Sequence, residues 1–272
     1  MPRLQRITAA GFPQHIIQRG NNRQDCFFAP ADYSAYLYWL NRAARTYRVA
    51  LHAYALMPNH VHLLVTPEVE CGVSRMMQYL GRHYVQYVNK TYRRSGTLWE
   101  HRFHASVVET DAYLLALYRY IELNPVRRGM VQAPEQYLWS SAQAHLAARE
   151  SPLIRDHESY LGLGDTKETR ALAYGALIRV PLEARALDQI RAAVRQGGVL
   201  GSDQFKDRIE MQLGRRVRPG RRGRKPKQLG AQPSAPQARP LLFALLSLVP
   251  GLAQRRGAEA APYEKAAPDA AF

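Results

Sequence analysis

The stretch ALHAYALMPNHVHLLVT, residues 50–66, contains two strand-like runs separated by a short turn signal. The first run, Ala50 to Leu56, and the second, His60 to Thr66, are rich in aliphatic residues with the alternation of β-strands. Met57-Pro58-Asn59 lies between them, and a Pro-Asn pair is typical of a tight connection. The stretch therefore predicts an antiparallel hairpin.

Further strand and helix patterns lie on both sides of this hairpin. We predict strands at Gln14 to Arg19 and Phe103 to Val108, and helices at Asp32 to Tyr47, Val73 to Tyr92 and Asp111 to Asn124. Pro125 is expected to end the last helix. The first six elements follow the order β-α-β-β-α-β, the split βαβ or ferredoxin-like arrangement. We therefore expect an α+β sandwich, with a four-stranded antiparallel sheet and helices on one face.

The character of the chain changes after this domain. We expect the α+β domain to occupy residues 1–145 and a helical, DNA-binding extension to occupy residues 146–213. Residues 214–228, GRRVRPGRRGRKPKQ, carry eight Lys or Arg and no acid, and are predicted to form a basic DNA-binding segment. Residues 229–272 are rich in Ala, Pro and Gln, which predicts a disordered tail.

The charge of the chain points to a polyanionic partner. Its 272 residues include 38 Lys and Arg against 22 Asp and Glu, giving a net charge of +16. Nucleic acid is the first candidate and an anionic membrane surface the second. The longest apolar run, Leu241 to Val249, is too short to span a bilayer, and no signal peptide is recognised. With two cysteines and no disulfide framework, a cytoplasmic, nucleoid-associated protein is expected.

The histidines of the hairpin form a candidate metal site. His60 and His62 are two apart on a strand, so their side chains point to the same side. Both imidazoles can then reach one divalent ion, while Val61, Leu63 and Val65 face the core. Taken alone, the same pattern also fits two partly exposed strand histidines without a ligand.

A second pair of residues extends this candidate site. Tyr120 and Asn124 are four apart on the last predicted helix and share a face. The Asn124 carboxamide oxygen is a hard ligand suited to Mg²⁺ or Mn²⁺, and a tyrosine hydroxyl can attack a phosphodiester. Tyr113 lies seven residues earlier on nearly the same face, so spacing alone leaves the identity of the nucleophile open.

Two motifs carry a resemblance to a known family. The segments LMPNHVHLL at residues 56–64 and RYIELNPVR at residues 119–127 resemble the signatures of single-tyrosine HUH transposases. More narrowly, the chain resembles REP-associated tyrosine transposases. The resemblance implies a ferredoxin-like catalytic domain in which His60 and His62 bind the metal and Asn124 is the third ligand. It also implies Tyr120 as the nucleophile, a 5′-phosphotyrosine intermediate, a free 3′-OH and a hairpin substrate of single-stranded DNA.

Basic residues near the motifs and in the tail are candidates for DNA contact. The predicted set is Arg19, Arg23, Arg102, Arg127, Arg215, Arg216, Arg222, Arg224 and Lys225. Arg222-Gly223-Arg224 is similar to a minor-groove hook, and a generic basic tail explains it equally well. The aromatic residues Tyr84, Tyr87, Tyr92 and Trp99 are candidates for stacking on unpaired bases.

Two other functions remain open at this point. A replication initiator or relaxase would share the metal and tyrosine, but the helicase version conflicts with the lack of a Walker-type GxxxxGK[ST] motif. A non-catalytic DNA-binding regulator could keep the fold without the chemistry. The sequence leaves open the DNA recognised, transposition against repeat processing, and monomer against homodimer.

Overall fold

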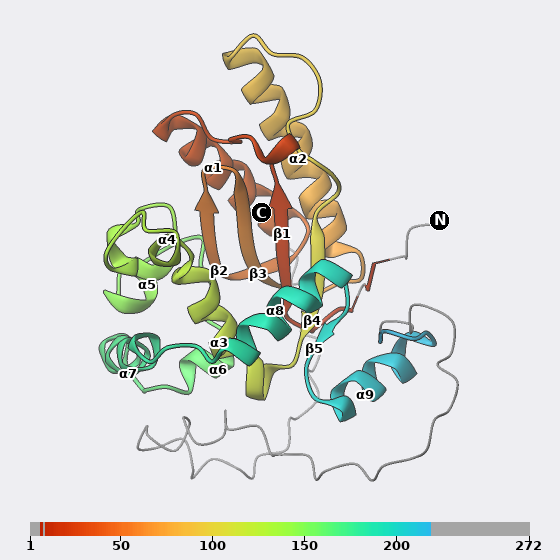
Figure 1. The fold of residues 1–272 in the computed structure, drawn as a ribbon, viewed down its shortest axis with the longest axis vertical. Coiled ribbons are helices and arrows are strands. Elements are labelled where there is room, and N and C mark those ends of the chain that lie inside the picture. The colour runs from red at the N-terminus through yellow and green to blue at the C-terminus, as the bar shows by residue number, and fades with distance from the viewer. Residues whose placement is uncertain (1–5, 8, 219–272) are drawn as a thin grey trace, which may run out of the picture.

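A computed structural model describes residues 6–7 and 9–218 of the chain, and its centre is a five-stranded sheet (Figure 1). The order is β2-β3-β1-β4-β5, formed by β1 (Gln14–Arg19), β2 (Val49–Met57), β3 (His60–Pro67), β4 (His104–Val108) and β5 (Val199–Leu200). The first four strands are antiparallel neighbours, as predicted. The fifth strand corrects the predicted strand count. It pairs parallel to β4 and is two residues long, too short to show a periodic pattern.

Two helices cover one face of the sheet. α1 (Pro30–Thr46) and α2 (Gly72–Thr91) pack there and lie behind the sheet in Figure 1. Val61, Leu63 and Val65 of β3 point to this side and are fully buried with the two helices. The prediction that both crossover helices share a face, with the histidines on the other, is confirmed.

The opposite face is covered by α3 (Thr110–Glu122) and by residues of the C-terminal extension. α3 ends at Glu122, and a short helix, α4 (Asn124–Arg127), follows it. The predicted helix end was therefore wrong. Pro125 lies in the first turn of α4, where its missing N–H and fixed φ are tolerated. Asn124 remains four residues after Tyr120, close to one helical turn.

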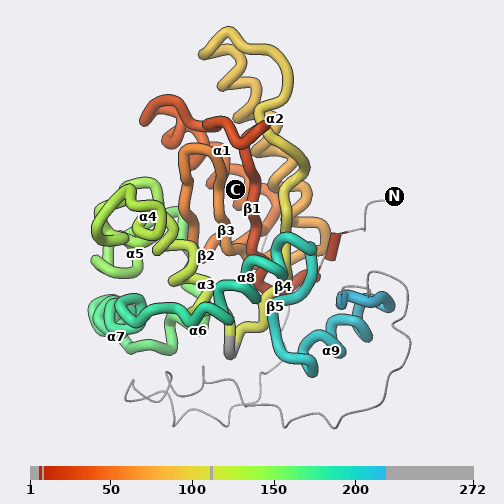
Figure 2. The backbone as a smooth tube through the Cα atoms, viewed as in Figure 1, coloured from red at the N-terminus to blue at the C-terminus, as the bar shows by residue number. Residues whose placement is uncertain are grey.

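The extension is helical, as predicted, and it packs closely on the sheet. It contains α6 (Glu158–Leu161), α7 (Lys167–Arg179), α8 (Ala184–Gln196) and α9 (Asp203–Leu213). The short helix α5 (Ala142–Leu146) precedes it, and 3₁₀ turns lie earlier in the chain at Asn21–Arg23 and Pro134–Gln136. Tyr160, Tyr174 and Ile190 share one buried cluster with Leu117 of α3. Figure 2 shows the chain running from α7 through α8, in front of the sheet, to β5. The boundary at residues 145 and 146 stays a prediction.

α9 is held at the end of the sheet by apolar and polar contacts. Phe205 and Ile209 are buried against Val107 and Val199. Glu109 accepts hydrogen bonds from the backbone N–H and the hydroxyl of Ser202, at 2.6 and 2.9 Å. Through β5 and α9 the extension covers the outer edge of β4, which would otherwise expose unpaired backbone groups. Within the described part of the chain, no helix has the length and apolarity needed to cross a membrane.

A buried carboxylate ties α3 to α5 and α7. Glu122 is fully buried and accepts hydrogen bonds from Ser141 (2.5 Å), His145 (2.6 Å) and Tyr174 (2.8 Å). Burial alone would lower the pKa of His145, but Glu122 and Asp156 together raise it to about 9. At neutral pH the imidazolium therefore compensates the Glu122 charge.

We expect Glu122→Ala to destabilise the protein by about 3–5 kcal/mol, because Ser141, His145 and Tyr174 would be left buried without the carboxylate that accepts their hydrogen bonds. Urea unfolding measures this difference. The control is Glu150→Ala, which removes an exposed carboxylate 3.1 Å from Lys167 and should cost less than about 1 kcal/mol. Equal losses in the two variants would contradict a stabilising role for the buried pair.

Candidate active site

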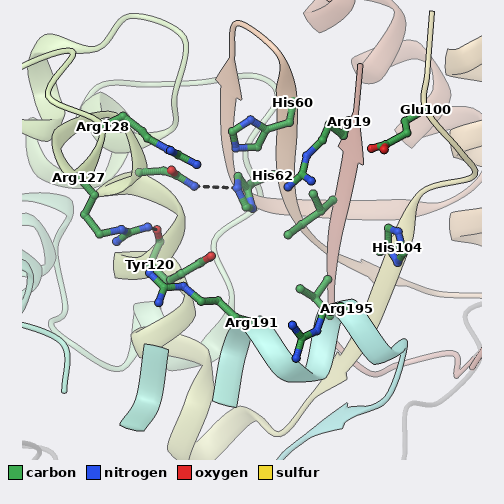
Figure 3. A pocket seen from close by; sticks show the side chains of 13 residues that line it. Arg19, His60, His62, Glu100, His104, Tyr120, Arg127, Arg128, Arg191 and Arg195 are labelled. Carbon is green, nitrogen blue, oxygen red and sulfur yellow. Dashed lines mark hydrogen bonds between the residues drawn. The ribbon is translucent and has the colours of Figure 1, made fainter. Parts of the chain in front are cut away.

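A cavity of about 670 Å³ opens on the α3 side of the sheet (Figure 3). Its lining comes from three strands, from α3 and α4, and from α8. The lining residues are Ile17, Arg19, His60, His62, Glu100, His104, Tyr120, Asn124, Arg127, Arg128, Arg191, Val194 and Arg195. The cavity thus brings together all four residues predicted for catalysis and metal binding.

Strands β1, β3 and β4 form the floor of the cavity, and their register decides which side chains meet there. β1 lies between β3 and β4, and Ile17 is opposite both His62 and His104. Arg19 is opposite His60. Because side chains two apart share a face, His15, Ile17 and Arg19 all project to the cavity side of β1. The floor therefore carries imidazole and guanidinium groups around one isoleucine.

His60 is held in one tautomer by its neighbour. Its Nδ1 lies 2.6 Å from Asn59 Oδ1, while Asn59 Nδ2 donates to the carbonyl of Arg23 at 3.2 Å. The second bond fixes which end of the Asn59 amide faces His60. An amide oxygen only accepts, so Nδ1 of His60 carries the proton and Nε2 keeps its lone pair. That tautomer presents Nε2 as a potential metal ligand.

His62 lies in a buried chain of three side chains. Its Nδ1 is 3.0 Å from Nε2 of His15, and its Nε2 is 2.7 Å from Nδ2 of Asn124. Because Asn124 donates through Nδ2, Nε2 of His62 accepts and Nδ1 carries the proton. His15 then accepts through Nε2 and has its own Nδ1 buried without a partner. His15 was not identified from the sequence.

Both candidate ligands are kept neutral. Burial, followed by the charges of Arg19 and Arg128, lowers the pKa of His60 to about 4. Burial and the neighbouring His60 and His15 hold the pKa of His62 well below its usual range. A neutral imidazole is the form that binds metal, so neither histidine must lose a proton first at neutral pH.

Tyr120 projects into the cavity from α3 (Figure 3). Its ring packs edge-on against His15 and His62, with 5.8 Å between centroids in each case. The guanidinium of Arg127 lies 4.5 Å from the ring centroid. Tyr113 is partly buried in the α3 cluster and does not line the cavity. The structure thus favours Tyr120 over Tyr113 as the residue placed beside the two histidines.

The donor set fits a hard divalent cation only if the amide takes part. Among the described residues, no group of three His, Cys, Asp or Glu side chains is placed to hold a metal. Two neutral histidines and a carboxamide supply three ligands and leave positions for phosphate and water. A carboxamide binds metal through oxygen, so ligation requires Asn124 to present Oδ1 in place of Nδ2. The metal site remains a prediction.

The predicted DNA-binding arginines fall into separate groups. Arg19 and Arg127 line the cavity, with Arg128 beside them. Arg23 and Arg102 are exposed but do not line it. Arg216 is exposed, whereas the Arg215 side chain donates to the carbonyl of Arg6. Arg222, Arg224 and Lys225 lie outside the described residues, as does the predicted tail.

Acidic side chains compensate part of the positive charge at the beginning of the basic segment. Arg218 lies 2.7 Å from Asp207 and 3.0 Å from Glu210, both on α9. The segment folds back on an acidic helix face, so these contacts compensate part of its positive charge.

The aromatic candidates for base stacking also make other contacts. Tyr84 and Trp99 are core residues, and Tyr87 and Tyr92 donate hydrogen bonds to Asp32.

Comparison with known proteins confirms the resemblance seen in the motifs. Residues 10–124 match the family model described as "Transposase IS200 like". A Haemophilus influenzae protein described as a REP-associated tyrosine transposase is 28% identical over 111 residues, 37% of this chain. The match spans 62% of that relative's length.

Two solved structures are similar in part. A REP-associated tyrosine transposase bound to a REP hairpin has a TM-score of 0.48 and 17% identity, covering 58% of this chain and 92% of its own. A Deinococcus radiodurans protein described as a transposase has a TM-score of 0.31 and 20% identity, covering 45% and 95%. The family resemblance therefore depends on the sequence match to residues 10–124, which contain His60, His62, Tyr120 and Asn124.

Proposed function

We propose that this chain is an IS200-like transposase that cuts and rejoins single-stranded DNA through Tyr120. The observation that carries the proposal is a single cavity that joins a tyrosine hydroxyl, two neutral histidines and an asparagine to several arginines. Fold alone would not support it, because the split βαβ arrangement hosts many functions. The match to the IS200-like family supports it independently.

The charge of the cavity suits a phosphodiester substrate. Among the described residues that line it are the five arginines Arg19, Arg127, Arg128, Arg191 and Arg195, against the single carboxylate of Glu100. Guanidinium groups donate paired hydrogen bonds that match phosphate oxygens. The cavity therefore attracts the DNA backbone and can stabilise charge that develops on a phosphoryl group.

The proposed step is an exchange of one phosphate ester for another. The Tyr120 oxygen attacks phosphorus and loses its proton, a Tyr–O–P bond forms, and the bond from phosphorus to O3′ breaks. The leaving O3′ takes up a proton and becomes a free 3′-OH, while the 5′ phosphate stays on Tyr120. Reversal by another 3′-OH rejoins a strand. Arg127, which lies over the Tyr120 ring, is placed to neutralise the phosphate.

His60, His62 and Asn124 would hold a divalent metal, Mg²⁺ or Mn²⁺, beside this step. Bound there, the ion would polarise the scissile phosphoryl oxygen and balance its developing charge. The contributions of the chain are the tautomers of the two histidines and their exclusion from bulk water. His62 is 3% and His60 7% exposed, so the strands and helices around them fix both rings.

We further propose that His15 positions His62 for metal binding. His15→Ala should weaken Mn²⁺ binding about 10- to 100-fold, the usual effect of removing an outer-shell partner. His15→Gln, which retains a hydrogen-bonding group, should recover part of the loss. Calorimetric titration of Mn²⁺ into the DNA-free protein measures both. If the two variants bind Mn²⁺ like the parent chain, His15 only fills the core.

The proposed substrate is single-stranded DNA that carries a hairpin, by analogy with the REP hairpin bound to the similar solved structure. The test is incubation of the protein with labelled hairpin oligonucleotides and Mg²⁺ or Mn²⁺. A covalent protein–DNA adduct, stable to denaturing electrophoresis, supports the proposal. Binding without an adduct, across several hairpins and both metals, would instead favour the DNA-binding regulator. Monomer or homodimer, and a cytoplasmic, nucleoid-associated location, remain part of the same proposal.

A further inference from the structure

Helix α8 contributes two arginines to the cavity from a distant part of the chain. Arg191 and Arg195 line it together with Tyr120 and the two histidines, although α8 begins 60 residues after the match to the IS200-like family ends at residue 124. In Figure 3 both side chains approach from α8, below Tyr120 and His62. The extension therefore forms one wall of the candidate active site.

The position of α8 is fixed by its apolar face. Ile190, Ala193 and Val194 are buried, and Ile190 and Ala193 belong to the same cluster as α3. α8 packs against β4, β5, α3 and β1. Since residues three or four apart lie on one side of a helix, burial of 190, 193 and 194 leaves Arg191 and Arg195 along the margin next to the cavity. The two guanidinium groups are thus carried by a rigid element.

The charges on this wall lack full compensation within the described structure. Arg195 makes no ion pair or hydrogen bond with the described residues, and Arg191 has Asp188 at 3.6 Å on the solvent side of its own helix. Burial, and after it the nearby charges of Arg191 and Arg128, lowers the pKa of Arg127. Guanidinium groups that line the same cavity repel each other, and an anion bound between them would offset this repulsion.

We propose that Arg191 and Arg195 bind backbone phosphates of the single DNA strand that crosses the cavity next to Tyr120. This inference rests on the proposed function, and it gives the extension a direct part in substrate binding. Arg191 of α8 and Arg127 of α4 both line the cavity, so in this proposal the strand passes between the two helices. Both arginines contact the backbone and not base edges, so they act on any sequence.

The test is the binding of labelled oligothymidylate and of a hairpin oligonucleotide at several salt concentrations. Measurements are made in a Tyr120→Phe background, so that no chemistry follows binding. The double variant R191A/R195A should bind both DNAs about 10- to 100-fold more weakly than its parent. Its slope of log affinity against log salt should fall by ~1.4, because each single-strand phosphate contact contributes ~0.7.

The matched control is R185A/R208A, which removes the same charge from exposed helix positions outside the cavity. It should keep the parent's salt slope to within a few tenths. Equal effects of the two double variants would overturn the inference and leave only a general charge effect. Thermal unfolding of each variant verifies that the fold is retained. If the chain with Tyr120 forms its adduct while R191A/R195A binds like its parent, the proposed function survives and this inference fails.

Discussion

The Tyr120→Phe protein is expected to bind hairpin DNA as tightly as the parent chain and to form no covalent adduct with it. Cleavage should fall by at least about 10³-fold, because the variant lacks the oxygen that would enter the new phosphate ester. Gel separation under denaturing conditions, with the DNA labelled on the 5′ side and then on the 3′ side of the break, measures both the adduct and its polarity. Only the fragment with the 5′ phosphate should remain attached to protein.

The surroundings of Tyr120 make this variant easy to interpret. Its ring contacts with His15, His62 and Arg127 involve the aromatic face and edges, which phenylalanine keeps. Among the described residues none is hydrogen-bonded to the Tyr120 hydroxyl, so its removal leaves no buried partner unsatisfied. Stability should change by less than about 1 kcal/mol. A loss of adduct then reports chemistry and not unfolding.

Tyr113→Phe is the matched control, on the same helix and with the same loss of one hydroxyl. It should retain the adduct, because Tyr113 lies outside the cavity. Should the adduct persist in Tyr120→Phe and disappear in Tyr113→Phe, the assignment of the nucleophile is wrong. If the adduct disappears in both variants, either the two tyrosines cooperate or the substitutions perturb α3. The assignment of Tyr120 as the sole nucleophile would then fail.

Local patterns in the sequence were sufficient for the parts of the site that depend on one element at a time. Strand alternation predicts that His60 and His62 share a face, and helical spacing predicts that Tyr120 and Asn124 do. The structure brings the two pairs together because β3 and α3 pack across the same face of the sheet. That packing could be expected only from the family resemblance, since nothing in either segment encodes their relative position.

The features of the site and fold that the sequence did not reveal depend on contacts between distant segments. His15 meets His62 only because β1 pairs with β3 in a register that places Ile17 opposite His62. The extension was predicted to be helical, but its sequence does not reveal which surface covers the apolar face of α8. The two-residue strand β5 and the pairing of Arg218 with α9 have the same origin. Such features follow from tertiary packing and not from propensity.

Removal of either candidate histidine ligand is expected to abolish cleavage while hairpin binding persists. His60→Ala and His62→Ala each delete one Nε2 from a site that has three protein donors, so Mn²⁺ affinity should fall by at least about 100-fold and cleavage by about 10³-fold. His62→Ala should also destabilise the fold more than His60→Ala. Its ring is fully enclosed, and its loss would leave His15 and Asn124 without their partner.

Asn124 provides the sharper test, because ligation through its Oδ1 and hydrogen bonding through its Nδ2 lead to different expected results. Asn124→Asp keeps an oxygen ligand and adds charge, so Mn²⁺ binding should be retained or strengthened, whereas Asn124→Ala should lose it. Calorimetric titration with the metal alone measures this without any DNA. His101→Ala, which removes an exposed histidine outside the cavity, should behave like the parent chain.

If His60→Ala and His62→Ala both cleave hairpin DNA at the parent rate, the histidines are structural and the metal site must lie elsewhere. If Asn124→Asp and Asn124→Ala lose Mn²⁺ equally, the amide acts through its donor on His62 and is no ligand.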